Sequence, residues 1–226
     1  MADQPGREAR RFTDCTAAWL ALVLVAIKAS FLGLPWRSAG GGLGYLQAVV
    51  AITYADVLFA AAAWATIRMV QAALGHLPRR WAARTTWAVA LGFVGLASLA
   101  AFLAVVDVGV FSVLGGFLTY PMLQLVGSVR MVRSSVGAHL TAPVIASLIS
   151  IPICVIAGSV WMHRRWTLLF TTRRHAWTVA ATAASWVLIG YIVYGVAWST
   201  RQERRIAQNG HWVLLASLWQ RDAAHL

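Results

Sequence analysis

Long apolar stretches, separated by short arginine-rich segments, make up most of the sequence. A helix needs about 20 mainly apolar residues to cross the hydrocarbon core of a bilayer. Five stretches reach roughly this length; they occupy residues 16–34, 45–74, 85–106, 139–162 and 176–199. The pattern therefore predicts an all-α fold, a polytopic bundle of five transmembrane helices.

The segment between the third and fourth predicted helices, residues 109–137, is apolar only in parts. It is broken by paired glycines, by Pro121 and by Gly127, and it ends with Arg130 and Arg133. Irregular backbone is not tolerated where it faces lipid. We therefore expect a re-entrant or interfacial segment with an amphipathic end. A sixth spanning helix is the alternative, and it would reverse the topology of everything that follows.

Composition and charge narrow the class of protein. Sixty per cent of the residues are apolar, mean hydropathy is +0.69 and only 12 % are charged. These values exclude a disordered chain, a collagen, a coiled coil and a disulfide scaffold. A soluble globule of this size lacks the interior to hide so much apolar surface. The net charge of +12 comes from short arginine clusters between apolar runs, which indicates membrane topology rather than a nucleic-acid partner.

The arginines predict which way the bundle faces. Loops on the cytoplasmic side of a membrane carry an excess of basic residues. Ten arginines fall on the leader and on the loops that share its side, and six fall on the other side. The ten are Arg7, Arg10, Arg11, Arg79, Arg80, Arg84, Arg164, Arg165, Arg173 and Arg174. We therefore expect a cytoplasmic basic leader at 1–15, a membrane domain at 16–200 and an extracytoplasmic juxtamembrane tail at 201–226, in a multi-pass protein of a bacterial inner membrane.

Two charged residues lie inside predicted helices, toward the outer half of the membrane. Lys28 belongs to the first helix and Asp56 to the second. An unpaired charge at such a depth is costly, so each needs a partner, a wet cavity or the interface. One interpretation is a buried Lys28–Asp56 pair that lines a cavity for an anionic lipid headgroup. The other is an interhelical pair that fixes packing, or a lysine that reaches the interface. Arg68, in the inner part of the second helix, is expected to extend to the cytoplasmic surface.

Three further charged residues are candidates for a site at the outer surface. Asp107 lies where the third predicted helix leaves the membrane, and it would either face a polar site or serve as an interfacial carboxylate or helix cap. Arg130 and Arg133 are three residues apart and share a helical face. Such a pair can clamp a phosphate or hold an amphipathic helix to anionic lipid. A solvated outer face is the alternative.

The sequence contains no recognisable catalytic or metal-binding motif. It lacks HExxH, CxxCH, GxSxG, a P-loop and a carboxylate cluster. No histidine lies in the middle of a predicted span, which argues against a bis-histidine haem in the bundle. We therefore predict no catalytic residue, no metal and no cofactor in this chain, and these residues leave open whether the protein is an enzyme.

Several stretches resemble the membrane part of a known family. Residues 117–125 (FLTYPMLQL), followed by 131–137 (MVRSSVG) and 140–141 (LT), resemble the outer loop and the start of the fourth helix of sulfatase-like membrane proteins. These proteins belong to the alkaline phosphatase superfamily and are similar to lipoteichoic acid synthases. Residues 54–59 (YADVLF) and the tail residues 204–215 (RRIAQNGHWVLL) fit the same pattern.

The resemblance implies a role for the tail. In that family a similar tail links the last of five membrane helices to an extracytoplasmic enzyme domain, which transfers or hydrolyses phosphate or sulfate esters with a metal-bound Thr, Ser or formylglycine nucleophile. No position in this chain matches the nucleophile or the metal ligands. The resemblance thus implies a membrane-anchoring, lipid-headgroup-facing domain whose partners are membrane lipids and a sulfatase-like domain in cis or in trans.

Two other classes of function stay open at this point. A small transporter or channel subunit would need a continuous polar pathway through both leaflets, and the predicted inner half offers few polar residues for one. A non-catalytic membrane scaffold would need no headgroup cavity.

Overall fold

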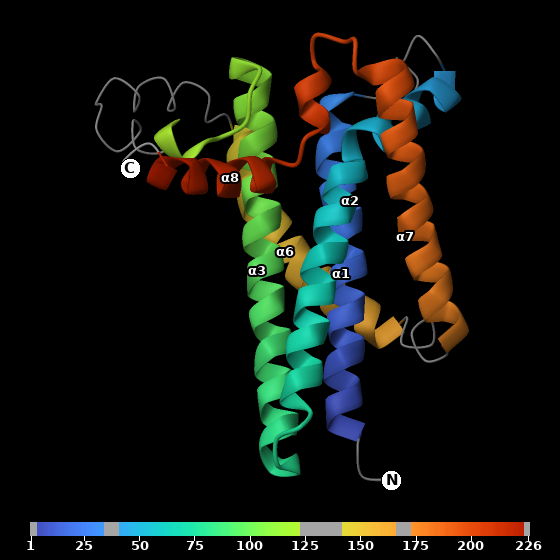
Figure 1. Ribbon diagram of the computed structural model, residues 1–226, viewed down its shortest axis with the longest axis vertical. Coiled ribbons are helices and arrows are strands. Elements are labelled where there is room, and N and C mark those ends of the chain that lie inside the picture. Colours follow the sequence, from blue (N-terminus) through green and yellow to red (C-terminus); the bar gives the residue numbers. More distant parts are fainter. Residues whose placement is uncertain (1–3, 34–40, 123–141, 166–172, 224–226) are drawn as a thin grey trace.

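The computed structural model describes residues 4–33, 41–122, 142–165 and 173–223, and its described elements are all helical. Five of these helices are long and apolar enough to cross a membrane. They are α1 (Gln4–Phe31), α2 (Gly41–Leu74), α3 (Arg79–Leu114), α6 (Ala142–Arg165) and α7 (Arg173–Val193). α1, α2 and α3 run along the long axis of the molecule (Figure 1). The prediction of an all-α fold with five helices suited to span a membrane is confirmed, and the orientation of the bundle stays a prediction.

Two helices extend well beyond the predicted apolar windows. α1 starts at Gln4 rather than at residue 16, and α3 continues to Leu114, past the predicted end at residue 106. A helix satisfies its own backbone hydrogen bonds, so it can continue into water beyond the apolar region. α3 stops at Gly115, whose φ of 65° and N–H bond to the carbonyl of Phe111 form a left-handed cap. Residues 109–114, the start of the segment predicted to be re-entrant, are therefore helical; residues 123–141, with Arg130 and Arg133, lie outside the described residues.

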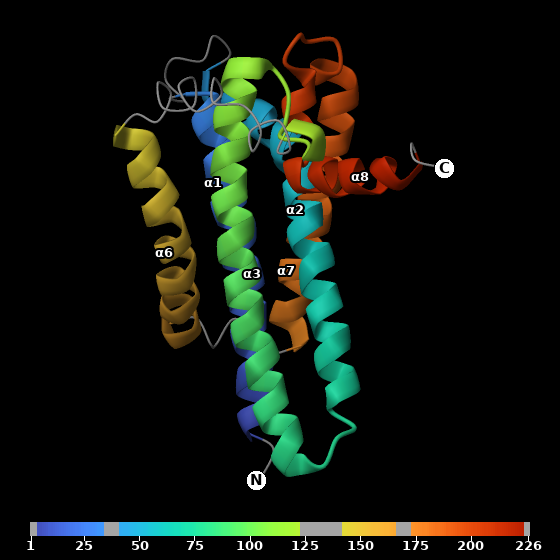
Figure 2. The same ribbon diagram turned by 90° about the vertical axis from the view of Figure 1, so that its left-hand side faces the viewer.

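The end of the chain folds back against the bundle. α7 continues into a π-helical turn, η3 (Tyr194–Trp198), which is followed by a short 3-10 helix, η4 (Arg204–Ala207). The last helix, α8 (Gly210–Ala223), lies across the spans, roughly perpendicular to them (Figures 1 and 2). α8 and the first turns of α1 lie in opposite halves of the molecule.

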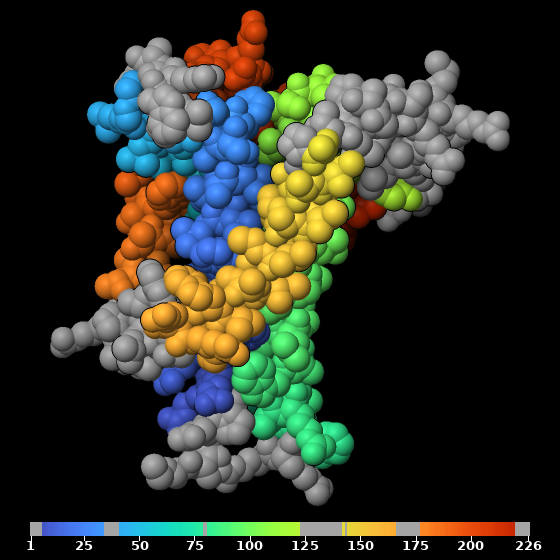
Figure 3. Space-filling view, turned by 180° about the vertical axis from the view of Figure 1, so that it is seen from behind, coloured from blue at the N-terminus to red at the C-terminus, as the bar shows by residue number. Residues whose placement is uncertain are grey.

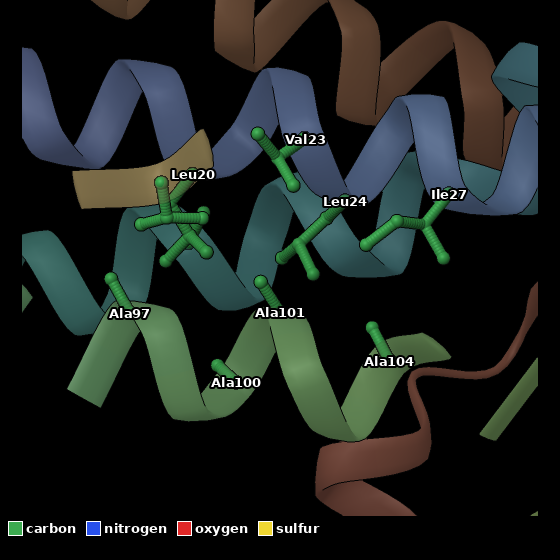
Figure 4. Packing of buried hydrophobic residues seen from close by; sticks show 10 residues of the cluster. Leu20, Val23, Leu24, Ile27, Ala97, Ala100, Ala101 and Ala104 are labelled. Atoms are coloured by element: carbon green, nitrogen blue, oxygen red, sulfur yellow. The ribbon is translucent and has the colours of Figure 1, made fainter. Parts of the chain in front are cut away.

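A layer of leucine and alanine joins α1 to α3 at the middle of the bundle. Figure 4 shows Leu20 and Leu24 of α1 beside Ala97 and Ala101 of α3, and all four are at most 1 % exposed. Small residues let two helix backbones approach closely, which is how helices gain contacts where no hydrophobic force drives them together.

The outer helices α6 and α7 each contact the rest of the bundle through one of their own glycines. Figure 3 shows α6 running obliquely across α1 and α3. Gly158 of α6 lies against the indole of Trp19, which donates to the carbonyl of Cys154 over 3.0 Å. Gly190 of α7 lies in the same way against Tyr54 of α2. At both positions a larger side chain would separate the helices.

Candidate functional site

Lys28 and Asp56 form a buried ion pair between α1 and α2. The Lys28 Nζ lies 2.7 Å from Asp56 Oδ2, and the two side chains are 5 % and 4 % exposed. Each charge therefore offsets much of the cost of burying the other. The structure thus brings together the two residues that the sequence nominated.

The tail supplies the remaining partners of this pair. Lys28 Nζ also donates to the carbonyls of Ile52, over 3.1 Å, and Gln208, over 2.6 Å. An ammonium group has three donors, and the three acceptors here are all protein atoms. Asn209 Nδ2 donates to Asp56 Oδ1 over 2.6 Å. The ion pair therefore holds the segment before α8 to α1 and α2.

Asn209 also determines where α8 begins. Its Oδ1 accepts a hydrogen bond from the N–H of Trp212 over 3.0 Å, which is the geometry of a helix N-cap. The next residue, Gly210, lies directly against the carboxylate of Asp107, where a Cβ would collide. A cap followed by a glycine thus lets the start of α8 press against α3.

Asp107 faces the Lys28–Asp56 pair and the start of α8 rather than open water. It is 6 % exposed, and its Oδ1 accepts from the N–H of Leu118 over 3.4 Å. We call Lys28, Asp56, Asp107, Asn209 and His211 the tail cluster. Four of these five (all but Asn209) line a cavity of about 10 Å³ together with Leu24, Ala104, Val108, Phe117 and Gly210. That space is close to what a single water molecule needs, and it is far too small for a phosphate group.

His211 ties the first turn of α8 to α3. Its Nε2 lies 2.8 Å from the carbonyl of Ala100, so we assign the proton to this nitrogen. The ring also stacks on Phe59, with centroids 4.5 Å apart. Burial lowers the pKa of His211 from 6.5, and this effect outweighs the opposing influence of the Ala100 carbonyl and the Asp56 carboxylate. The folded protein therefore favours a neutral imidazole here.

A second cluster joins α1 to α2 at the opposite end. Asp14 accepts from the indole of Trp64 over 2.7 Å and lies 3.7 Å from Arg68. The buried Gln71 donates to Thr13 over 2.8 Å. We call these five residues the leader-side cluster. Arg68 was expected to extend to the cytoplasmic surface; in the structure it pairs with Asp14, which the sequence analysis had assigned to the leader.

Sequence reasoning missed Asn209 and His211 because the tail was interpreted as a juxtamembrane linker. One signal was present. An asparagine followed by a glycine and an amphipathic run is typical of a helix start. Among the described residues, no group of three or more His, Cys, Asp or Glu side chains is arranged to hold a metal ion.

Comparison with protein-family models, with curated proteins and with solved structures found no significant match for this chain. The geometry of the tail cluster indicates a structural role. Its ammonium donors and the amide of Asn209 are directed at protein atoms, so the arrangement is suited to hold the tail in place.

Proposed function

We propose that this chain is the membrane domain that holds a sulfatase-like ester transferase or hydrolase domain at the outer face of a bacterial inner membrane, in the same polypeptide or as a partner. The observation that carries this proposal is the hydrogen bond from Asn209 to Asp56. It joins two of the stretches that resemble the sulfatase-like family, residues 54–59 and residues 204–215.

A third stretch that resembles this family, residues 117–125, also contacts the tail cluster. The ring of Phe117 lies 5.6 Å from Lys28 Nζ, and the N–H of Tyr120 donates to Ser217 of α8 over 2.9 Å. Sequence stretches that are far apart in the chain, and that were grouped only by their likeness to one family, therefore converge on the tail cluster. This convergence is what an anchor with a fixed tail requires.

The mechanism of such an anchor is positional. A freely jointed linker would let an attached domain sample many heights above the membrane, whereas a docked tail restricts it. Restricting a catalytic group to the plane of its membrane-bound substrate raises the effective concentration of the two. The tail cluster would supply this restriction, and headgroup recognition would fall to Arg130 and Arg133, which stays a prediction.

Cysteine labelling of the intact chain in cells tests the orientation. In a background where Cys15 and Cys154 are replaced by serine, Glu203→Cys places an exposed thiol in the tail and His76→Cys places one at the α2–α3 turn. We expect a membrane-impermeant maleimide to label the first variant in intact spheroplasts and the second only after permeabilisation. The opposite pattern would overturn the outer-face anchor.

The enzymatic part has its own test. The protein is isolated from its native membranes with whatever chain continues or accompanies the tail. We expect it to hydrolyse an aryl phosphate or aryl sulfate, and the activity to disappear with a chelator and return with a divalent metal ion. A preparation without such activity, or with activity that does not depend on a metal, would overturn the link to a sulfatase-like domain.

A further inference from the structure

α8 carries an exposed apolar stripe. Trp212, Leu215, Ala216 and Trp219 follow one another at helical spacing, and all four are exposed; Trp219 is 84 % exposed. A spacing of three, four and seven residues places side chains on one face of a helix. Within the described part of the chain, this face of α8 is left largely uncovered, apart from the contact that Trp212 makes with Phe59.

The contacts of α8 show which way this stripe points. Ser217, on the opposite face, bonds to Tyr120 in the segment that follows α3. Trp212 meets the ring of Phe59 edge-on, with centroids 5.7 Å apart. Phe59 lies about one turn further along α2 than Asp56, toward the middle of the bundle. The stripe therefore faces the midplane of the spans, and Ser217 faces the end of the molecule.

The level of α8 matches a lipid–water boundary. His211, in its first turn, bonds to Ala100 of α3, which lies 16 residues after the exposed Arg84. At about 1.5 Å per residue these residues are ~24 Å apart, in a hydrocarbon core of ~30 Å. Helices that lie in the interface bury their apolar face roughly 5–10 Å deep. Leu58 of α2 and Leu99 of α3, which neighbour in sequence the residues that α8 contacts, are exposed apolar residues as well.

We propose that α8 lies in the lipid–water interface of the leaflet where α1 ends, with the Trp212–Trp219 stripe inserted among the acyl chains. The partner is the bilayer itself. This inference goes beyond the anchoring function and does not rest on it, because it holds whichever side of the membrane that leaflet faces. It assigns the tail cluster the task of holding an interfacial helix at a fixed depth.

Spin labelling of the full chain in vesicles of phosphatidylethanolamine and phosphatidylglycerol tests the proposal. Trp219→Cys and Glu203→Cys are each labelled in the background where Cys15 and Cys154 are serine. We expect the label at position 219 to collide several times more often with oxygen than with a water-soluble nickel chelate, and the label at 203 to show the reverse. Because Trp219 touches little of the protein, its replacement should leave the unfolding midpoint unchanged.

Two outcomes would overturn the proposal. A label at 219 that is as accessible to nickel as the label at 203 would show that the stripe faces water, as a docking face for a soluble partner would. A dipolar broadening at 219 that disappears on dilution with unlabelled protein would show a second copy on the stripe. If the maleimide experiment gives the opposite pattern, α8 lies in the leaflet on the other side of the membrane, and the expected depth of position 219 stays the same.

Discussion

Among single residues, the Lys28–Asp56 pair is expected to matter most for the stability of the folded protein. Asp56→Ala would leave the Lys28 ammonium buried with only carbonyl partners. Breaking a buried ion pair in this way costs about 3–5 kcal/mol of stability. We expect a loss of that size in the free energy of unfolding, measured by titration with sodium dodecyl sulfate in mixed micelles.

The double variant Lys28→Met/Asp56→Leu is the matched control. It removes both charges and restores apolar volume. Its loss of stability should therefore be smaller than the sum of the losses caused by Lys28→Met alone and by Asp56→Leu alone. A coupling of roughly 0.5–3 kcal/mol is usual for residues in contact. Additive effects of the two substitutions would contradict a coupled pair.

His211 makes the docked tail sensitive to pH. Burial lowers the pKa of His211 in the folded protein, so the unfolded chain takes up the proton first as the pH falls below 6.5. The contribution of His211 to stability is complete above 6.5 and is lost as the pH falls toward the lower folded pKa. We expect faster hydrogen exchange in residues 204–219 at acidic pH, after correction for intrinsic rates.

The control for this pH effect is His211→Gln. Its amide keeps a donor for the Ala100 carbonyl but does not titrate. The acid-dependent part of the exchange should therefore disappear in this variant. An unchanged acid dependence would assign the effect to another group.

The sequence predicted some members of the tail cluster and missed others for a physical reason. Lys28 and Asp56 are conspicuous because a charge within an apolar run is costly and must be compensated. Asn209 and His211 stand in a polar tail, where such residues need no explanation. Their role depends on the tail folding back onto the bundle, and that contact spans 153 residues between Asp56 and Asn209.

At the scale of helices, glycines determine how closely the spans pack against one another. A Cβ on Gly190 would collide with Tyr54 and would lie 2.7 Å from the backbone oxygen of Val50, which cannot move aside without moving α2. Overpacking of this kind costs roughly 1–3 kcal/mol. We expect Gly190→Ala to lower the free energy of unfolding in mixed micelles by that amount.

Gly92→Ala is the matched control for this substitution. Gly92 lies in α3 with no atom within 4 Å of the added Cβ. Alanine loses less conformational freedom than glycine on forming a helix, so this change should stabilise the protein by about 0.5–1 kcal/mol. Equal effects at both positions would show that backbone entropy, and not the contact with α2, decides the result.

Helix lengths were less predictable than helix existence. Five spans follow from apolar runs of about the right length, whereas α1 begins well before its apolar run and α3 ends at the left-handed cap of Gly115, outside its run. α8 has only 14 residues, fewer than a membrane-spanning helix needs, so a search for spanning segments does not detect it. The position of α8 follows from Asn209 and Gly210.

At the scale of the whole molecule, the ion pairs found among the described residues lie toward opposite ends of the bundle. Asp14, in the leader-side cluster, and Lys28, in the tail cluster, are both on α1 and lie ~21 Å apart along its axis. Between them Leu20 and Leu24 are in close contact with the alanines of α3 (Figure 4). Among the described residues, the apolar layer separates the two clusters, whereas conduction requires a continuous polar path.

This separation predicts that the protein does not conduct. In proteoliposomes with a pH-sensitive dye inside, we expect the proton leak under an imposed potential to equal that of empty vesicles. An ionophore added at the end shows that the potential was present and that the dye responds. A leak above background that falls in both Asp14→Asn and Asp56→Asn would connect the clusters through the leucine and alanine layer and favour a transporter over an anchor. A leak above background that neither variant reduces would also contradict the prediction, because it would show a path through the protein that avoids both clusters.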